Sequence, residues 1–247
     1  LAGESLSQEH IEELIEIAGS DDEEAASSSV KLLRDISHIQ SSSLDAYVES
    51  LSRRIAQLDE DNEWKKLDGL IDSIWSVAQH NPQAAAEAYE LVFEYHTHEP
   101  PYGSTAANAL PYFAEVEVDL VDSLVERLKN DAASGRKQSA YAIKQIAEDH
   151  PNKIASSITP LFAFAEDQDE SDKMRKHLLE ALAGYAKEYP DEISPYKQSI
   201  FAIARDHKQY HKVRGAATEV LSALAEHHPE AFSSDLEELA VLLEDEN

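Results

Sequence analysis

One short segment combines side chains of the types that bind a divalent metal. His96 and His98 are two residues apart, Glu99 follows directly, and two prolines then interrupt the chain. Imidazole nitrogens and carboxylates are zinc ligands, but three groups within four residues at a helix end seldom complete a tetrahedral site. No other segment offers an evident fourth ligand. We therefore expect no metal and no cofactor, and a metal-dependent enzyme centred on these three residues remains an alternative.

Three arginines recur at a fixed interval and could bind anions. Arg136, Arg175 and Arg214 are 39 residues apart, and each is expected near a helix N-terminus, where the helix dipole favours negative charge. Asp167 and Asp206 precede Arg175 and Arg214 by eight residues. Charged pairs at a repeat spacing usually brace neighbouring repeats. We therefore favour a structural role for this row over an anion-binding stripe.

Other catalytic signatures are absent from the sequence. There is no cysteine, so a thiol nucleophile, a disulfide and a Cys-based zinc site are excluded. No nucleophile elbow or glycine-rich phosphate loop occurs. His80, His150 and His228 lie at the expected turns between repeats, where capping of helix carbonyls explains them better than catalysis. The protein is predicted not to be an enzyme.

The elements that would position these residues follow a repeat. Pro151, Pro190 and Pro229 share the 39-residue interval of the arginines, and so does the apolar column Ile143, Leu182 and Leu221. Apolar residues recur at helical spacing throughout, without the alternation of a strand. We expect helices over 6–18, 21–38, 43–58, 62–80, 82–97, 103–115, 116–130, 133–149, 151–166, 170–188, 191–205, 209–227 and 231–244. Pro111 is expected to kink the sixth of them.

Helix pairs of this size cannot bury both faces alone, so neighbouring pairs must stack. The pattern predicts an all-α chain: an α-solenoid of stacked antiparallel helix pairs, with about six repeats and a terminal half-repeat. We expect a single domain over residues 1–247, with a soft joint near 99–104. A chain that begins without Met and ends on a half-repeat could also be part of a longer protein.

Two segments carry a resemblance to a known family. FAEDQDESDKMRKHLLEALAGYAKEYP and FAIARDHKQYHKVRGAATEVLSALAEHHP each combine an apolar helix, an aspartate, a polar turn and an arginine that opens an Ala-rich helix. They resemble HEAT repeats, closely from about residue 130 onward and loosely over 62–130. The resemblance implies an Asp–Arg ladder formed by Asp167, Asp206 and the three arginines. It implies no particular function, because such solenoids include scaffolds, transport factors, lyases and repair enzymes.

A binding surface is expected along the concave face formed by the second helices of the pairs. Its outward positions are Tyr141, Lys144, Glu148, Glu180, Lys187, Glu219 and Glu226. Trp64, which precedes two lysines, is a further recognition candidate, whereas Trp75 lies on an apolar stripe and is expected in the core. A solvated face without a ligand is the simpler interpretation of the row.

The charge of the chain limits its partners. With 21 basic and 49 acidic residues the net charge is −28, which repels phosphate backbones and argues against nucleic acid as a partner. No signal peptide is visible in this sequence, and no apolar run is long enough for a membrane helix, so a cytoplasmic protein is expected. Regular apolar spacing argues against disorder. The acidity is typical of halophilic archaeal proteins, although Lys outnumbers Arg by 13 to 8.

Three functions are consistent with these observations. The first is a non-catalytic protein-interaction scaffold adapted to high salt, with a protein partner that the sequence does not identify. The second is an acidic decoy or chaperone for a basic partner protein. The third is a metal-dependent or lyase-like HEAT-repeat enzyme.

Overall fold

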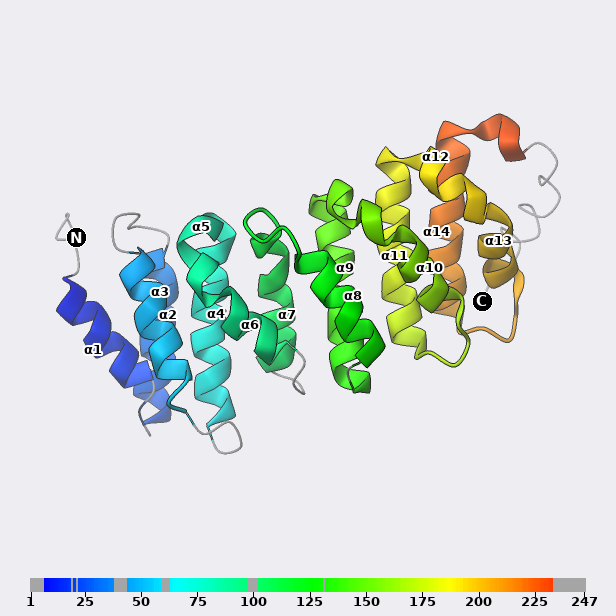
Figure 1. Ribbon diagram of the computed structural model, residues 1–247. Helices are drawn as coiled ribbons and strands as arrows, with labels where there is room; N and C mark the ends of the chain where they lie inside the picture. The colour runs from blue at the N-terminus through cyan, green and yellow to red at the C-terminus, as the bar shows by residue number, and fades with distance from the viewer. Residues whose placement is uncertain are drawn as a thin grey trace. The chain divides into compact units, whose positions relative to one another are not determined.

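The computed structural model describes residues 7–18, 20, 22–37, 44–58, 63–96, 102–130 and 132–232 (Figure 1). Within these ranges every regular element is a helix. The chain forms two compact units, residues 1–120 and 121–247. The predicted soft joint at 99–104 lies partly outside the described residues, and the prediction of one uninterrupted domain stays a prediction. Each unit is described separately below.

The first unit contains three helix pairs among its described residues. Its elements are α1 (Gln8–Ala18), α2 (Glu23–Ser37), α3 (Leu44–Ile55), α4 (Trp64–His80), α5 (Pro82–Ala85), the 3₁₀ helix η1 (Ala86–Ala88), α6 (Tyr89–Tyr95) and α7 (Tyr102–Phe113). The second helices α2, α4 and α7 pack side by side in one layer, and α1, α3 and α5 form the other. Asp68 of α4 accepts a hydrogen bond from the Thr105 hydroxyl of α7 at 2.6 Å, so a polar contact also links these repeats.

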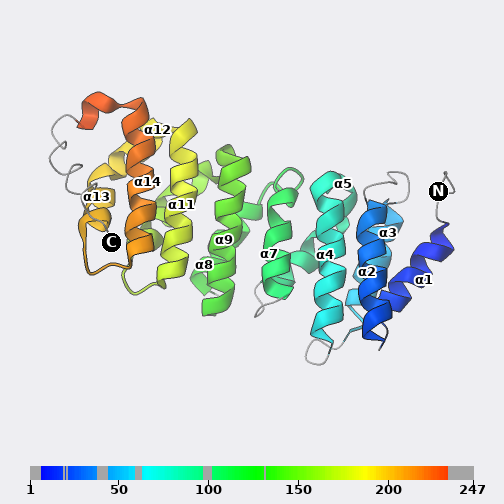
Figure 2. The ribbon, with the colours of Figure 1, turned by 180° about the vertical axis from the view of Figure 1, so that it is seen from behind.

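The second unit repeats the arrangement. Its elements are α8 (Leu120–Asn130, which begins at the unit boundary), α9 (Ala133–Asp149), η2 (Pro151–Ser157), α10 (Ile158–Glu166), α11 (Asp172–Glu188), α12 (Pro190–Ile193), η3 (Ser194–Tyr196), α13 (Lys197–Arg205), α14 (His211–His227) and η4 (Pro229–Phe232). Within this unit α11 packs between α9 and α14, while α10 packs on α11 and α13 on α14. Viewed from behind, α9, α11 and α14 stand side by side in front of the shorter helices (Figure 2).

The repeated prolines end the second helices. A residue that precedes proline is pushed out of the α conformation, and proline itself is accommodated in the first turn of the next helix. His150, Tyr189 and His228 take this position with φ between −136° and −128°, and each donates its backbone N–H to the carbonyl four residues earlier. The 39-residue spacing of the prolines therefore equals the spacing between the ends of successive second helices.

The first helices differ from the prediction in one respect. The segments 82–97, 151–166 and 191–205 were expected as continuous helices, but each is divided into 3₁₀ and α portions. Pro160 and Pro195 lack the N–H that an α-helix would bond to the carbonyl four residues back, which explains the interruption in the last two segments. Another predicted helix, 116–130, begins only at Leu120, because residues 114–119 form turns.

The core follows the predicted apolar columns. Ile143, Leu182 and Leu221, one from each second helix of the second unit, are fully buried. Three equivalent side chains on successive helices form a continuous interior because each repeat covers its neighbour. The prediction of an all-α fold of stacked helix pairs is thus confirmed for the described residues. The terminal half-repeat expected over 231–244 lies mostly outside them.

Two helical glycines are predicted to respond oppositely to alanine. A Cβ on Gly215 of α14 would meet nothing within 4 Å, whereas a Cβ on Gly184 of α11 would lie 3.2 Å from the Ala147 carbonyl oxygen of α9. Alanine in an exposed helix interior stabilises by about 0.5–1 kcal/mol relative to glycine. We expect Gly215→Ala to raise the free energy of unfolding by that amount in urea titrations. Gly184→Ala should show no gain or a loss; an equal gain at both positions would contradict the close approach of α9 and α11.

Candidate binding surface

The second helices of the second unit present consecutive rows of polar side chains. The structure places Tyr141, Lys144 and Glu148 on α9, Glu180 and Lys187 on α11, and Glu219 and Glu226 on α14. Because α11 lies between α9 and α14, these rows belong to one surface, which we call the second-helix face. The two halves of this surface differ in how their charges are used.

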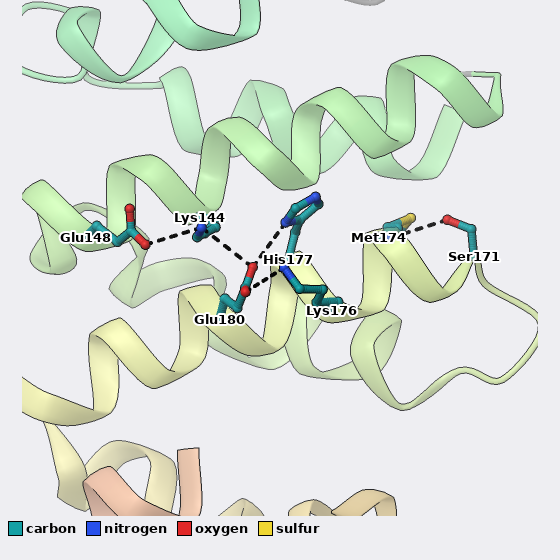
Figure 3. A network of polar contacts seen from close by, with 7 residues as sticks. All are labelled: Lys144, Glu148, Ser171, Met174, Lys176, His177 and Glu180. Carbon is teal, nitrogen blue, oxygen red and sulfur yellow. Dashed lines mark hydrogen bonds and ion pairs between the residues drawn. The ribbon is translucent and has the colours of Figure 1, made fainter. Parts of the chain in front are cut away.

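Charges on α9 and α11 converge on one carboxylate (Figure 3). Lys176 Nζ lies 2.6 Å from Glu180 Oε1, and His177 Nδ1 lies 3.1 Å from Glu180 Oε2. From the neighbouring repeat, Lys144 Nζ lies 3.7 Å from Glu180 Oε2 and 3.4 Å from Glu148 Oε1. The structure therefore brings three of the predicted surface residues into a single network that crosses from α9 to α11.

The electrostatics of Glu180 reflect this network. Burial of the side chain raises the pKa of Glu180, but hydrogen bonds from His177 and Lys176 and the charges of Lys144 and Lys176 outweigh it and lower the pKa to about 2. The carboxylate is only 16% exposed, as is consistent with its enclosure by three donors. The Glu180 carboxylate therefore binds side chains of the protein itself and is not available to bind a ligand.

Sequence reasoning missed two members of this network. Lys176 and His177 lie on α11 one turn before Glu180, and the His177 ring also contacts Tyr141 edge-on at a centroid distance of 5.5 Å. The signal was available in the spacing, because residues three and four apart on a helix are neighbours. The contact between His177 and Tyr141 could not be read from this spacing, because it joins residues of different repeats.

The row on α14 is different. Glu219 and Glu226 are exposed, and in the part of the chain that the structure describes they have no ion-pair partner. Lys187 of α11 is likewise exposed and without an ion pair among the described residues. These are the predicted surface residues whose charges remain free for an external partner.

The arginine row is turned inward. Arg175 is 2% exposed; its Nε donates to the Ala165 carbonyl at 3.0 Å and its Nη1 donates to Gln209 Oε1 at 2.5 Å. Burial lowers the pKa of Arg175, while the carboxylates of Asp172, Asp167 and Asp206 oppose this shift. A guanidinium held in this way bridges the end of one first helix and the turn of the following repeat.

Arg136 and Arg214 follow the same scheme. Arg136 donates its Nε to the Leu128 carbonyl and pairs through Nη2 with Glu170, while Arg214 donates its Nε to the Ala204 carbonyl at 3.3 Å. Glu170 and Gln209 are equivalent positions, 39 residues apart, and sequence reasoning missed both. These contacts support a structural role for the row and argue against an anion-binding stripe.

The aspartates predicted for the ladder organise the turns. Asp167 Oδ1 accepts the backbone N–H of Asp169, and Asp206 accepts the N–H of Lys208 and the side-chain amide of Gln209. Those hydrogen bonds lower the pKa of Asp206. Asp167 and Asp206 act on Arg175 through charge, whereas the hydrogen bonds of Arg175 go to a carbonyl and an amide.

The metal candidates are only partly described. His96 is fully buried at the end of α6, and its Nδ1–H donates to the Phe93 carbonyl oxygen. His98 and Glu99 lie outside the described residues. No group of three potential metal ligands occurs in the ranges that the structure covers. The Nδ1 of His96 is thus committed to the backbone of its own helix.

The remaining candidates are placed as follows. Trp64 is the first residue of α4, and its side chain lies outside what the structure describes; Trp75 is half-buried. His80 contacts the Ser76 carbonyl at 2.8 Å, which confirms the capping predicted for it. His228 Nε2 lies 3.0 Å from Asp191, at the start of the first helix of the same pair. Among the described residues no helix has the length and apolar character needed to cross a membrane.

Comparison with known proteins shows similarity at the level of structure. No family model matches the sequence, and no curated protein of similar sequence was found. A crystal structure of mutant Kap121p superimposes with a TM-score of 0.70 at 14% identity, over 94% of this chain and 27% of that one. The karyopherin Kap121p bound to the extreme C-terminus of the protein phosphatase Cdc14p gives a TM-score of 0.64 at 17% identity, over 92% of this chain and 24% of that one.

A smaller protein shows the same architecture. Computationally designed armadillo repeat proteins for modular peptide recognition match with a TM-score of 0.50 and 17% identity, over 86% of this chain and 99% of that one. This chain spans about a quarter of the length of Kap121p but nearly all of the designed repeat protein. Together with the stacked helix pairs described above, these matches establish that the chain has an α-solenoid fold.

Proposed function

We propose that this protein is a non-catalytic interaction scaffold that binds another protein along the second-helix face of residues 121–247. The observation that carries the proposal is the contrast on that face between the enclosed Glu180 and the exposed Glu219 and Glu226, which have no ion pair among the described residues. Stacked second helices offer an extended surface of the kind that solenoids use for binding. The similar solved structures include proteins described as binding peptides or protein segments.

The test reverses the free charges and leaves the enclosed one intact. We expect the double variant Glu219→Lys, Glu226→Lys to lose proteins that the unchanged chain captures from a native lysate, because like charges across an interface disfavour binding. Glu180 is excluded from the set, since its reversal would place a lysine among Lys144, Lys176 and His177. Captured proteins are quantified by mass spectrometry.

A matched control carries the same change of charge elsewhere. Glu166 at the end of α10 and Asp169 in the following turn are exposed and are not part of a second helix. The variant Glu166→Lys, Asp169→Lys should retain capture. Equal capture by the unchanged chain and the Glu219/Glu226 variant would remove this surface from the proposal.

The same exposed glutamates favour a second candidate, an acidic decoy or chaperone for a basic partner. Binding dominated by charge weakens steeply as salt rises, whereas a scaffold adapted to concentrated salt should fold or bind better in it. The net charge of −28 is consistent with either. Capture at low and high KCl therefore separates the two functions.

A further inference from the structure

We call the packed contact between two consecutive second helices a helix joint. The two helix joints of the second unit can be compared residue by residue. The second helices α9 and α11 pack on each other, and so do α11 and α14. The three helices are related by steps of 39 residues, so every contact across the first joint has an equivalent position pair across the second. Comparing the side chains at equivalent positions then shows which type of interaction holds each pair of helices together.

Ion pairs span the first joint at two places. Arg136 at the start of α9 pairs with Glu170 in the turn before α11. Further along the same helices, Lys144 Nζ lies 3.7 Å from Glu180 Oε2. These four side chains are each 13–24% exposed, so they are partly shielded from water but not sealed from dissolved ions.

Both pairs are absent at the equivalent positions of the second joint. Gln209 stands where the first joint has Glu170, and Arg175 donates to its neutral amide oxygen at 2.5 Å. Ala183, which is buried, stands where the first joint has Lys144, and the residue equivalent to Glu180 is the exposed Glu219, which has no ion pair among the described residues. Thus two partly exposed ion pairs cross the first joint, whereas a neutral acceptor and a methyl group stand at the equivalent positions of the second. The attraction between Arg175 and Asp206 that does cross the second joint involves a guanidinium that is only 2% exposed.

We propose that the α9–α11 joint is more sensitive to ionic strength than the α11–α14 joint. Dissolved salt screens attraction between partly exposed charges, and the Debye length falls from about 10 Å at 0.1 M to about 3 Å at 1 M. Packing of apolar side chains and the buried bond from Arg175 to Gln209 are screened far less. Since each repeat in a solenoid contacts only its neighbours, opening at one joint is a local event. This inference does not depend on the proposed function.

The experiment is amide hydrogen exchange on the whole chain at about 0.1 M and about 1 M KCl. Salt also relieves the overall repulsion of an acidic protein, so exchange in α9 is compared with exchange in α14 of the same molecule. We expect the ratio of α9 to α14 exchange to rise roughly threefold at the higher salt. An unchanged ratio would overturn the proposal.

A reciprocal swap supplies the matched control. Glu170→Gln together with Gln209→Glu exchanges the two equivalent side chains between the joints. In the unchanged chain Glu170 stands three residues after Asp167. The new glutamate at position 209 would stand in the same relation to Asp206. We expect the salt response to shift from α9 toward α14 in this variant, and to shrink at α9 in the independent variant Lys144→Met. A salt response that neither variant alters would show that these ion pairs do not control it.

Discussion

Replacement of Arg175 by alanine is expected to lower the free energy of unfolding by about 2–4 kcal/mol. The guanidinium is 2% exposed and donates to the Ala165 carbonyl and to Gln209, so its removal leaves two acceptors without their donor and opens a cavity. The effect should be large because these groups lie between a first helix and the turn of the next repeat. Urea titration followed by circular dichroism measures it.

Two further variants distinguish the contribution of the Arg175 hydrogen bonds to stability from that of its side-chain volume. Arg175→Lys keeps the charge but loses the planar fork that reaches both acceptors, so most of the destabilisation should remain. Arg136→Ala removes the equivalent side chain, which is 24% exposed, and a smaller loss is expected. If Arg175→Ala were as stable as the unchanged protein, the inward-turned arginines would not be braces.

Acidification is expected to remove a stabilising contribution of Glu180 on the order of 2 kcal/mol. Its pKa is lowered from 4.5 to about 2 in the folded state. A carboxyl group with a depressed folded pKa stabilises fully above its unfolded pKa and loses that contribution as the pH falls through the folded value. The loss should therefore develop between about pH 4.5 and pH 2. In this range Glu180 is protonated, and Lys144, Lys176 and His177 no longer contact a negatively charged carboxylate.

The measurement compares the unchanged protein with Glu180→Gln across that range. The variant should be less stable at neutral pH, and the two stability curves should converge as the pH falls. Glu219→Gln provides the control, because Glu219 is exposed and has no ion-pair partner in the described part of the chain. Its curve should stay parallel to that of the unchanged protein. Parallel curves for Glu180→Gln as well would mean that Lys144, Lys176 and His177 do not stabilise this carboxylate.

The amino-acid pattern alone was sufficient for the architecture. Prolines at 151, 190 and 229 end one helix and begin the next through steric effects on adjacent residues. The column of Ile143, Leu182 and Leu221 requires only the helical period and the 39-residue repeat to be recognised as core. Such features are readable because they depend on residues close in sequence or on strict repetition. The 3₁₀ interruptions were missed, although Pro160 and Pro195 offered a local signal for two of them.

The candidate surface was predicted only in outline. Positions on the second helices were identified from the helical period, but the prediction treated Glu180 and Glu219, which occupy equivalent places, as alike. Part of the difference is local, because Lys176 and His177, one turn before Glu180, have Gly215 and Ala216 as their counterparts before Glu219. The rest depends on Lys144 and Ala183, which stand at equivalent positions on the preceding helix. Partners 34–36 residues apart, such as Arg136 with Glu170 or Lys144 with Glu180, meet only once neighbouring helices are packed. Local patterns therefore determine the helices and their repeat, whereas the packing of one repeat on the next decides which charges are neutralised and which remain free.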